Sequence, residues 1–176
     1  MNIYRLICAV LILTACHDQN KNTISTVELM KTQEIKKVTE AEILQGGSLI
    51  GGEVMKVINQ VIQKNINPDS PTCDISKWDE LDTLAQFYKV EIDKVGNQTP
   101  NKSDLEFQLL EAYQYNLEND LTATAAVQKA DRKTVLYAYP IAKNDLVYKY
   151  CMDSTQQTKA EMWRLKIPIK EIILRL

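Results

Sequence analysis

Residues 132–141 read RKTVLYAYPI, and residues 161–169 read EMWRLKIPI. Both segments are rich in β-branched and aromatic residues, which favour strands. Pro140 and Pro168 stand near the ends of these segments, where a strand tolerates a missing N–H. The segments VEIDKV (90–95) and DLVYKY (145–150) alternate apolar and polar residues with the period of a half-buried strand. The sequence therefore predicts strands mainly in the second half of the chain.

Helical patterns dominate the first half. Apolar residues recur at helical spacing from about residue 24 to Asn65 and again from 75 to 88. Ser103 and Glu106 form a capping box that starts a third helix, which runs to Leu117. Helices that precede a cluster of strands indicate an α+β fold with an antiparallel sheet and long N-terminal helices. We expect one domain over residues 24–176.

Two pairs of glycines interrupt the first helical pattern: Gly46-Gly47 and Gly51-Gly52. Gly47 and Gly51 are four residues apart, so they form a smooth strip on one helical face. Such a strip lets another chain segment or a flat ligand approach closely, although each glycine also weakens a helix and a kink would fit equally well. Close packing is the favoured interpretation and a ligand contact the alternative. The order G-x-G-x-x-G of a nucleotide-binding loop is absent.

The first sixteen residues are typical of a lipoprotein signal. Arg5 gives a positive start, residues 6–14 form a short apolar run, and LTAC (13–16) matches a lipobox. The run is too short for a permanent membrane span. We therefore predict a signal peptide (1–15) and a polar tether (16–23). Cys16 is expected to carry lipid that includes a palmitoyl chain. A chance LTAC after an ordinary signal peptide is the alternative. The residue after Cys16 is not aspartate, which favours the outer membrane.

Charge and cysteine usage fit this envelope address. The net charge of −2 argues against nucleic acid as a partner, because that partner requires clustered Lys and Arg. Once Cys8 leaves with the signal and Cys16 carries lipid, Cys73 and Cys151 remain. In an oxidising compartment they are either a disulfide or two separate buried thiols.

The residues that most enzymes need are scarce. The chain has one histidine, His17, which lies on the tether. A Ser-His-Asp or Cys-His arrangement requires a rigidly held imidazole, and zinc sites require several His or Cys ligands. No C-x-x-C or phosphate-binding loop is present. We expect neither an enzyme nor a metal site.

Aromatic residues mark one candidate pocket. Tyr137 and Tyr139 repeat with period two, as do Tyr148 and Tyr150. These side chains form either an aromatic cross-strand face in the core or the wall of a pocket for a flat apolar ligand. The candidate pocket residues are Tyr137, Tyr139, Trp163, Gly47 and Gly51.

Three segments, in the order in which they follow one another along the chain, resemble a known family of bacterial envelope domains of unassigned function. The domains of that family carry one c-type haem on a PAS-like fold. The three segments are VEIDKVGNQTPNKSDLEFQLLEAYQ (90–114), YAYPIAKNDLVYKYC (137–151) and EMWRLKIPI (161–169). The resemblance covers roughly Lys36 to the end of the chain. It implies a PAS-like antiparallel sheet.

The chain departs from that family at the haem attachment site. Where the family reads C-x-x-C-H, this chain has Cys151, then Ser154 and Thr155 at the second cysteine and histidine positions. A serine forms no thioether and a threonine is a poor iron ligand, so we expect no covalent haem c. Cys73 stands near the place of a family cysteine that faces the haem. The resemblance thus implies a Cys73–Cys151 disulfide across the vacated cavity.

These observations give three functional hypotheses. The first is a non-enzymatic sensory or small-ligand-binding module, anchored through its N-terminal lipid with the domain in the periplasm. Its expected partners are a small apolar ligand or another envelope protein. The second is a residual haem-binding or redox-active protein that uses Cys73 and Cys151. The third is a structural envelope component without a ligand.

Overall fold

A computed structural model describes residues 37–67 and 69–176, and Val38–Leu176 form one compact unit. The predicted signal peptide (1–15), the lipidation at Cys16 and the tether (16–23) lie outside the described residues. The helices of the described chain are α3 (Glu40–Asn65), α4 (Asp79–Tyr88), α5 (Asp104–Glu118), α6 (Leu146–Cys151) and α7 (Ile169–Ile173). The strands are β1 (Ile66–Asn67), β2 (Ser70–Pro71), β3 (Glu91–Gly96), β4 (Ala126–Lys129), β5 (Thr134–Pro140) and β6 (Glu161–Pro168). Short 3₁₀ turns lie at Ile75–Lys77 and Gln156–Thr158.

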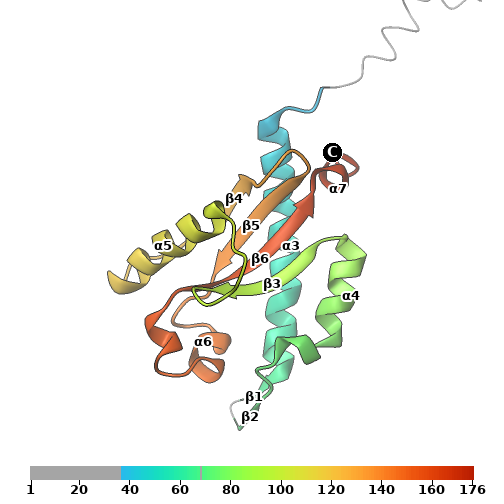
Figure 1. The fold of residues 1–176 in the computed structure, drawn as a ribbon. Helices are drawn as coiled ribbons and strands as arrows, with labels where there is room; N and C mark the ends of the chain where they lie inside the picture. Colours follow the sequence, from blue (N-terminus) through green and yellow to red (C-terminus); the bar gives the residue numbers. More distant parts are fainter. Residues whose placement is uncertain (1–36, 68) are drawn as a thin grey trace, which may run out of the picture. The chain divides into compact units, whose positions relative to one another are not determined.

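The central element is a four-stranded antiparallel sheet with the order β3-β6-β5-β4 (Figure 1). β1 and β2 form a separate short hairpin. The α+β fold with an antiparallel sheet and a long first helix is therefore confirmed. Three predicted strands are confirmed, at 90–95, 132–141 and 161–169. The fourth, 145–150, is wrong because those residues form α6.

Alternation along the strands gives the sheet two apolar faces. On one face, the helices α3, α4, α6 and α7 cover side chains such as Tyr137, Trp163 and Leu165. On the other face, α5 covers Leu136 and Met162. The first helix ends at Asn65 as expected. The predicted pattern ran on from about residue 24, but residues 37–39 are not helical, and α3 begins at Glu40 because Thr39 and Glu42 form a capping box. The predicted capping box of α5 is also confirmed.

The glycine strip on α3 is a packing contact. A Cβ at Gly51 would lie 2.2 Å from Cδ2 of Tyr137, and a Cβ at Gly47 would lie 2.8 Å from Cγ1 of Val135. Only glycine lets the helix lie this close to β5. α3 runs without interruption through both glycine pairs, so the alternative of a kinked, broken helix is not realised.

Replacing Gly51 with alanine is expected to lower the free energy of unfolding by about 1–3 kcal/mol, because the added methyl group overpacks the Tyr137 ring. The matched control is Gly52→Ala, whose Cβ meets nothing within 4 Å. This control should stabilise the protein by up to about 1 kcal/mol through helix propensity. Urea denaturation of both variants checks the prediction, and equal stabilisation of the two would contradict it.

The apolar residues at the C-terminal end are buried only in part. Ile172 is fully buried against α3, but Ile173, Leu174 and Leu176 are 45%, 67% and 53% exposed. The short helix α7 offers only one face to the core, so its remaining apolar side chains point outward.

Candidate functional site

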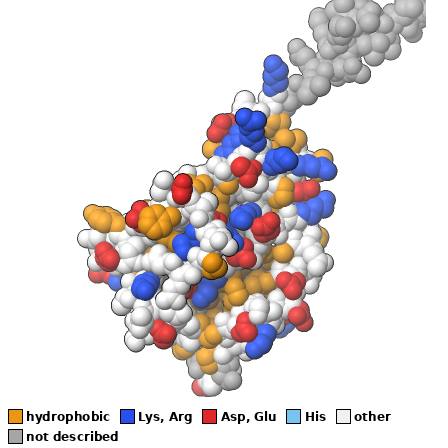
Figure 2. Space-filling model, in the orientation of Figure 1, with side chains coloured by type: hydrophobic (Ala, Val, Ile, Leu, Met, Phe, Trp, Pro, Cys, Tyr) orange, Lys and Arg blue, Asp and Glu red, His pale blue; other side chains and the backbone are white. Residues whose placement is uncertain are grey.

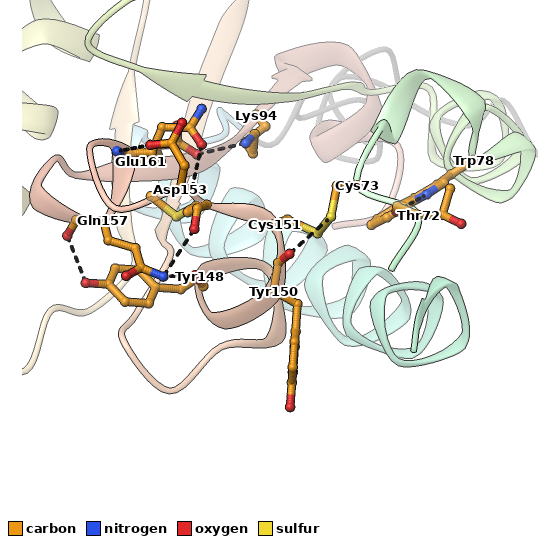
Figure 3. The surroundings of a disulfide bond; sticks show 12 residues. Thr72, Cys73, Trp78, Lys94, Tyr148, Tyr150, Cys151, Asp153, Gln157 and Glu161 are labelled. Carbon is orange, nitrogen blue, oxygen red and sulfur yellow. Dashed lines mark hydrogen bonds and ion pairs between the residues drawn. A yellow bond between two sulfur atoms is a disulfide. The ribbon is translucent and has the colours of Figure 1, made fainter. Parts of the chain in front are cut away.

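A disulfide joins Cys73 to Cys151, which are 78 residues apart, with a Cα–Cα distance of 5.2 Å (Figure 3). Cys73 lies between β2 and the 3₁₀ turn at Ile75–Lys77, and Cys151 is the last residue of α6. The bridge therefore ties α6 to the connection that follows α3. Of the two alternatives left by the sequence, the disulfide is the one that forms.

The segment after Cys151 is held by its own side chains. The carboxylate Oδ1 of Asp153 accepts the N–H of Thr155 at 2.9 Å. The Gln157 amide donates to the carbonyl oxygen of Tyr148 at 3.1 Å, and the Tyr148 hydroxyl donates back to the Gln157 carbonyl oxygen at 2.8 Å (Figure 3). These bonds and the disulfide fix both ends of the segment relative to α6.

A polar cavity of about 260 Å³ lies between this segment and the end of β3. An ion pair stands at its wall, where Nζ of Lys94 is 2.8 Å from Oε2 of Glu161 (Figure 3). The two side chains are 22% and 13% exposed, so the pair is largely withdrawn from water. The cavity is lined by Lys94, Gly96, Asn97, Gln98, Thr99, Thr155, Gln156, Lys159 and Glu161.

The ion pair leaves polar groups with capacity for further bonds. Oε2 of Glu161 is buried. Its contact with Lys94 is an ion pair without hydrogen-bond geometry. No other donor among the described residues reaches this oxygen. Lys159 has no ion-pair partner among the described residues. Buried acceptors of this kind are usually satisfied by water or by a ligand. The cavity thus presents two ammonium groups, one carboxylate and several neutral donors and acceptors.

The five predicted pocket residues do not share one cavity. Gly47 and Gly51 pack against β5, and the Tyr137 ring fills the space beside Gly51. Tyr139 and Trp163 line a different cavity of about 290 Å³, between α6 and the last turns of α3. Asp145 also lines it, and burial raises the pKa of this carboxyl although the Ala142 N–H it accepts opposes the rise.

The residues at the predicted haem attachment site do not fit covalent haem c. Cys151 is bonded to Cys73 and has no thiol to offer a vinyl group. Ser154 and Thr155 are exposed, and Thr155 lines the polar cavity. No histidine occurs among residues 37–67 and 69–176, and the same residues contain no group of three or more potential metal ligands.

Sequence reasoning missed Lys94, Lys159 and Glu161. The register pairs Lys94 with Trp163 and Gly96 with Glu161, which places Lys94 diagonally opposite Glu161 on the same face of the sheet. A second missed cavity, of about 300 Å³, lies under the end of α5 and has apolar walls that include Leu117, Leu121 and Ile141. The alternation within one strand predicts which side chains share a face, but not which residues of another strand lie opposite.

Comparison with protein-family models gives no match, and comparisons with curated proteins and with solved structures give none either. Among the described residues, none of the helices combines the length and apolar character that crossing a bilayer requires.

Proposed function

We propose that this protein is a lipid-anchored lipoprotein of the bacterial envelope, whose domain is a non-enzymatic, haem-free module that binds a small polar ligand. The polar cavity with the Lys94–Glu161 pair carries the proposal. The α+β fold with its antiparallel sheet is compatible with a PAS-like module. The lipobox that ends at Cys16 supports the anchor, and a disulfide is what an oxidising compartment allows.

The cavity favours a ligand of defined chemistry. Lys94 and Lys159 place two positive charges at the wall against one carboxylate, which favours a net negative ligand. Oε2 of Glu161 accepts no hydrogen bond from the described residues, which favours a ligand that also carries a hydrogen-bond donor. Sites for drug-sized molecules begin at about 300 Å³, so a cavity of about 260 Å³ suits a small molecule such as a hydroxy or amino acid.

The proposal predicts that protein purified from the envelope carries a lipid mass on Cys16, shows no Soret band, and holds a small molecule detectable by native mass spectrometry. Lys159→Glu should lower the bound fraction at least about tenfold, because it reverses a charge at the wall. Lys149→Glu is the matched control, since it makes the same charge change on the exposed side of α6.

Each part of this prediction can fail separately. A Soret band would contradict the haem-free module, and an unmodified Cys16 would contradict the anchor. Absence of any bound mass, or equal loss in Lys159→Glu and Lys149→Glu, would contradict ligand binding at the polar cavity.

The second candidate is a redox-active protein that cycles the Cys73–Cys151 bridge. The observation in its favour is that both cysteines are partly exposed, so a reductant can reach them. Redox titration against glutathione separates the two functions. A reduction potential below about −300 mV identifies a structural disulfide and contradicts redox cycling, whereas a higher potential supports it.

A further inference from the structure

Three elements meet at one end of the domain: the start of α3, the turn between β4 and β5, and α7 (Figure 1). The N–H of Ile169 donates to the carbonyl oxygen of Lys133 at 2.7 Å, which joins the turn to α7. A Cβ on Gly46 would lie 2.5 Å from Cγ2 of Ile172, which places α7 beside the second turn of α3. The compact unit also begins at this end, with Val38 just before α3.

Exposed basic side chains gather at this end (Figure 2). Among the described residues, Lys129, Arg132, Lys133 and Lys170 have no ion-pair partner. Acidic groups lie here as well: Asp131 accepts the N–H of Lys133, Glu171 pairs with Lys89, and Glu40 and Glu42 stand in the first turn of α3. We call this surface the basic end; its cationic residues are Lys129, Arg132, Lys133, Lys170 and Arg175.

Apolar side chains stand among these charges. Ile173, Leu174 and Leu176 are 45%, 67% and 53% exposed, and Leu174 and Leu176 stand on either side of Arg175. Exposed leucine and isoleucine flanked by Lys and Arg are typical of surfaces that lie in a membrane interface, where the apolar groups enter the headgroup region and the cations meet lipid phosphates.

We propose that the basic end docks on the anionic phospholipid headgroups of the membrane that carries the Cys16 lipid. Charge complementarity carries the choice of partner, since each Lys or Arg near such a surface strengthens binding about fivefold. The chain as a whole has a net charge of −2, so the same field repels the rest of the domain and orients it. The inference rests on the proposed anchor, which holds the chain next to the bilayer.

The test uses the full lipidated protein reconstituted into vesicles of phosphatidylethanolamine and brominated phosphatidylglycerol. The indole of Leu174→Trp reports on depth, because the native Trp78 and Trp163 are each only 2% exposed and contribute a constant background. The control reporter is Tyr150→Trp on α6, which packs at the opposite, C-terminal part of α3 (Figure 1). Vesicles of brominated phosphatidylcholine supply the neutral surface.

We expect quenching of Leu174→Trp on anionic but not on neutral vesicles, and none of Tyr150→Trp. Adding Arg132→Glu with Lys133→Glu should lower the docking equilibrium constant about thirtyfold or more, at about fivefold per basic residue. Lys56→Glu with Lys149→Glu changes the net charge equally at exposed sites elsewhere and should leave quenching intact. About 1 M NaCl should abolish it, because the Debye length falls to about 3 Å.

The docking proposal would be overturned by any of three results: equal quenching of both reporters, no quenching of Leu174→Trp, or equal effects of the two charge reversals. Failure of the anchor gives a different result. Intact mass would then show no lipid on Cys16, and the protein would leave the vesicles entirely in high salt instead of remaining attached with its reporter unquenched.

Discussion

Replacing both Cys73 and Cys151 with serine is expected to lower the free energy of unfolding by about 4–5 kcal/mol. The disulfide closes a loop of 78 residues, and the chain-entropy model assigns roughly this stabilisation to a loop of that length. The measurement is urea denaturation of the oxidised protein and of the double variant. A loss of this size is a large fraction of the stability of an ordinary domain.

The reduced wild-type protein is the control for this experiment. It has the same bridge broken without a change of side chain, so its stability should match that of the double variant within about 1 kcal/mol. A double variant that unfolds at the same urea concentration as the oxidised protein would show that the bridge does not constrain the unfolded chain.

Replacing Arg164 with methionine is expected to lower the free energy of unfolding by about 2–4 kcal/mol. The guanidinium of Arg164 on β6 donates from Nη1 to Oε1 of Glu106 at 2.8 Å and from Nη2 to Oδ2 of Asp93 at 2.7 Å. Glu106 is 3% exposed, so its carboxylate would lose its only cationic partner among the described residues. Breaking a buried pair costs about 3–5 kcal/mol. The expected loss of stability is smaller here because Ser103 still donates its N–H to Glu106.

The cost of Arg164→Met should depend on pH. Burial raises the pKa of Glu106, but the Ser103 N–H and the Arg164 guanidinium outweigh burial, and the pKa lies below its usual 4.5. The resulting stabilisation is present above the unfolded pKa of about 4.5 and disappears as the pH falls through the lowered folded value. Urea denaturation of wild type and variant at neutral pH and near pH 3 measures this.

Glu106→Gln is the matched control, because glutamine keeps an acceptor for Ser103 in the capping box and removes the buried charge. It should cost less than Arg164→Met at neutral pH, and its cost should also shrink in acid. If Arg164→Met costs the same at both pH values, charge pairing is not what holds α5 to the sheet.

Local signals in the sequence were sufficient for most elements. The capping box predicted at Ser103 corresponds to a helix start because its bonds form within four residues. The box at Thr39 is an equally local signal, but it was not predicted. The strand predicted at 145–150 fails for a tertiary reason. Asp145 accepts the N–H of Ala142 at 2.7 Å and closes a turn, after which Val147 and Cys151, four residues apart, both face the core. One helical turn therefore replaces the period of two.

The candidate site was less accessible to sequence reasoning. Cysteine usage alone left two alternatives, a disulfide or two separate thiols, and only the suspected resemblance favoured the disulfide. The polar cavity depends on which residues of β3 lie opposite β6, and no residue pattern states that register. The short edge strand β4 also gave no signal, because four residues that are only partly buried resemble a loop.

The contact between Gly51 and Tyr137 also fixes the axial position of α3 on the sheet. If α3 slid by one turn, about 5.4 Å, in one direction, Met55 would meet the Tyr137 ring; in the other direction, Ile43 would meet Val135. Neither side chain fits where only glycine does. Axial sliding is therefore blocked both ways, so α3 keeps a single register on the sheet in any rearrangement that leaves the helix folded.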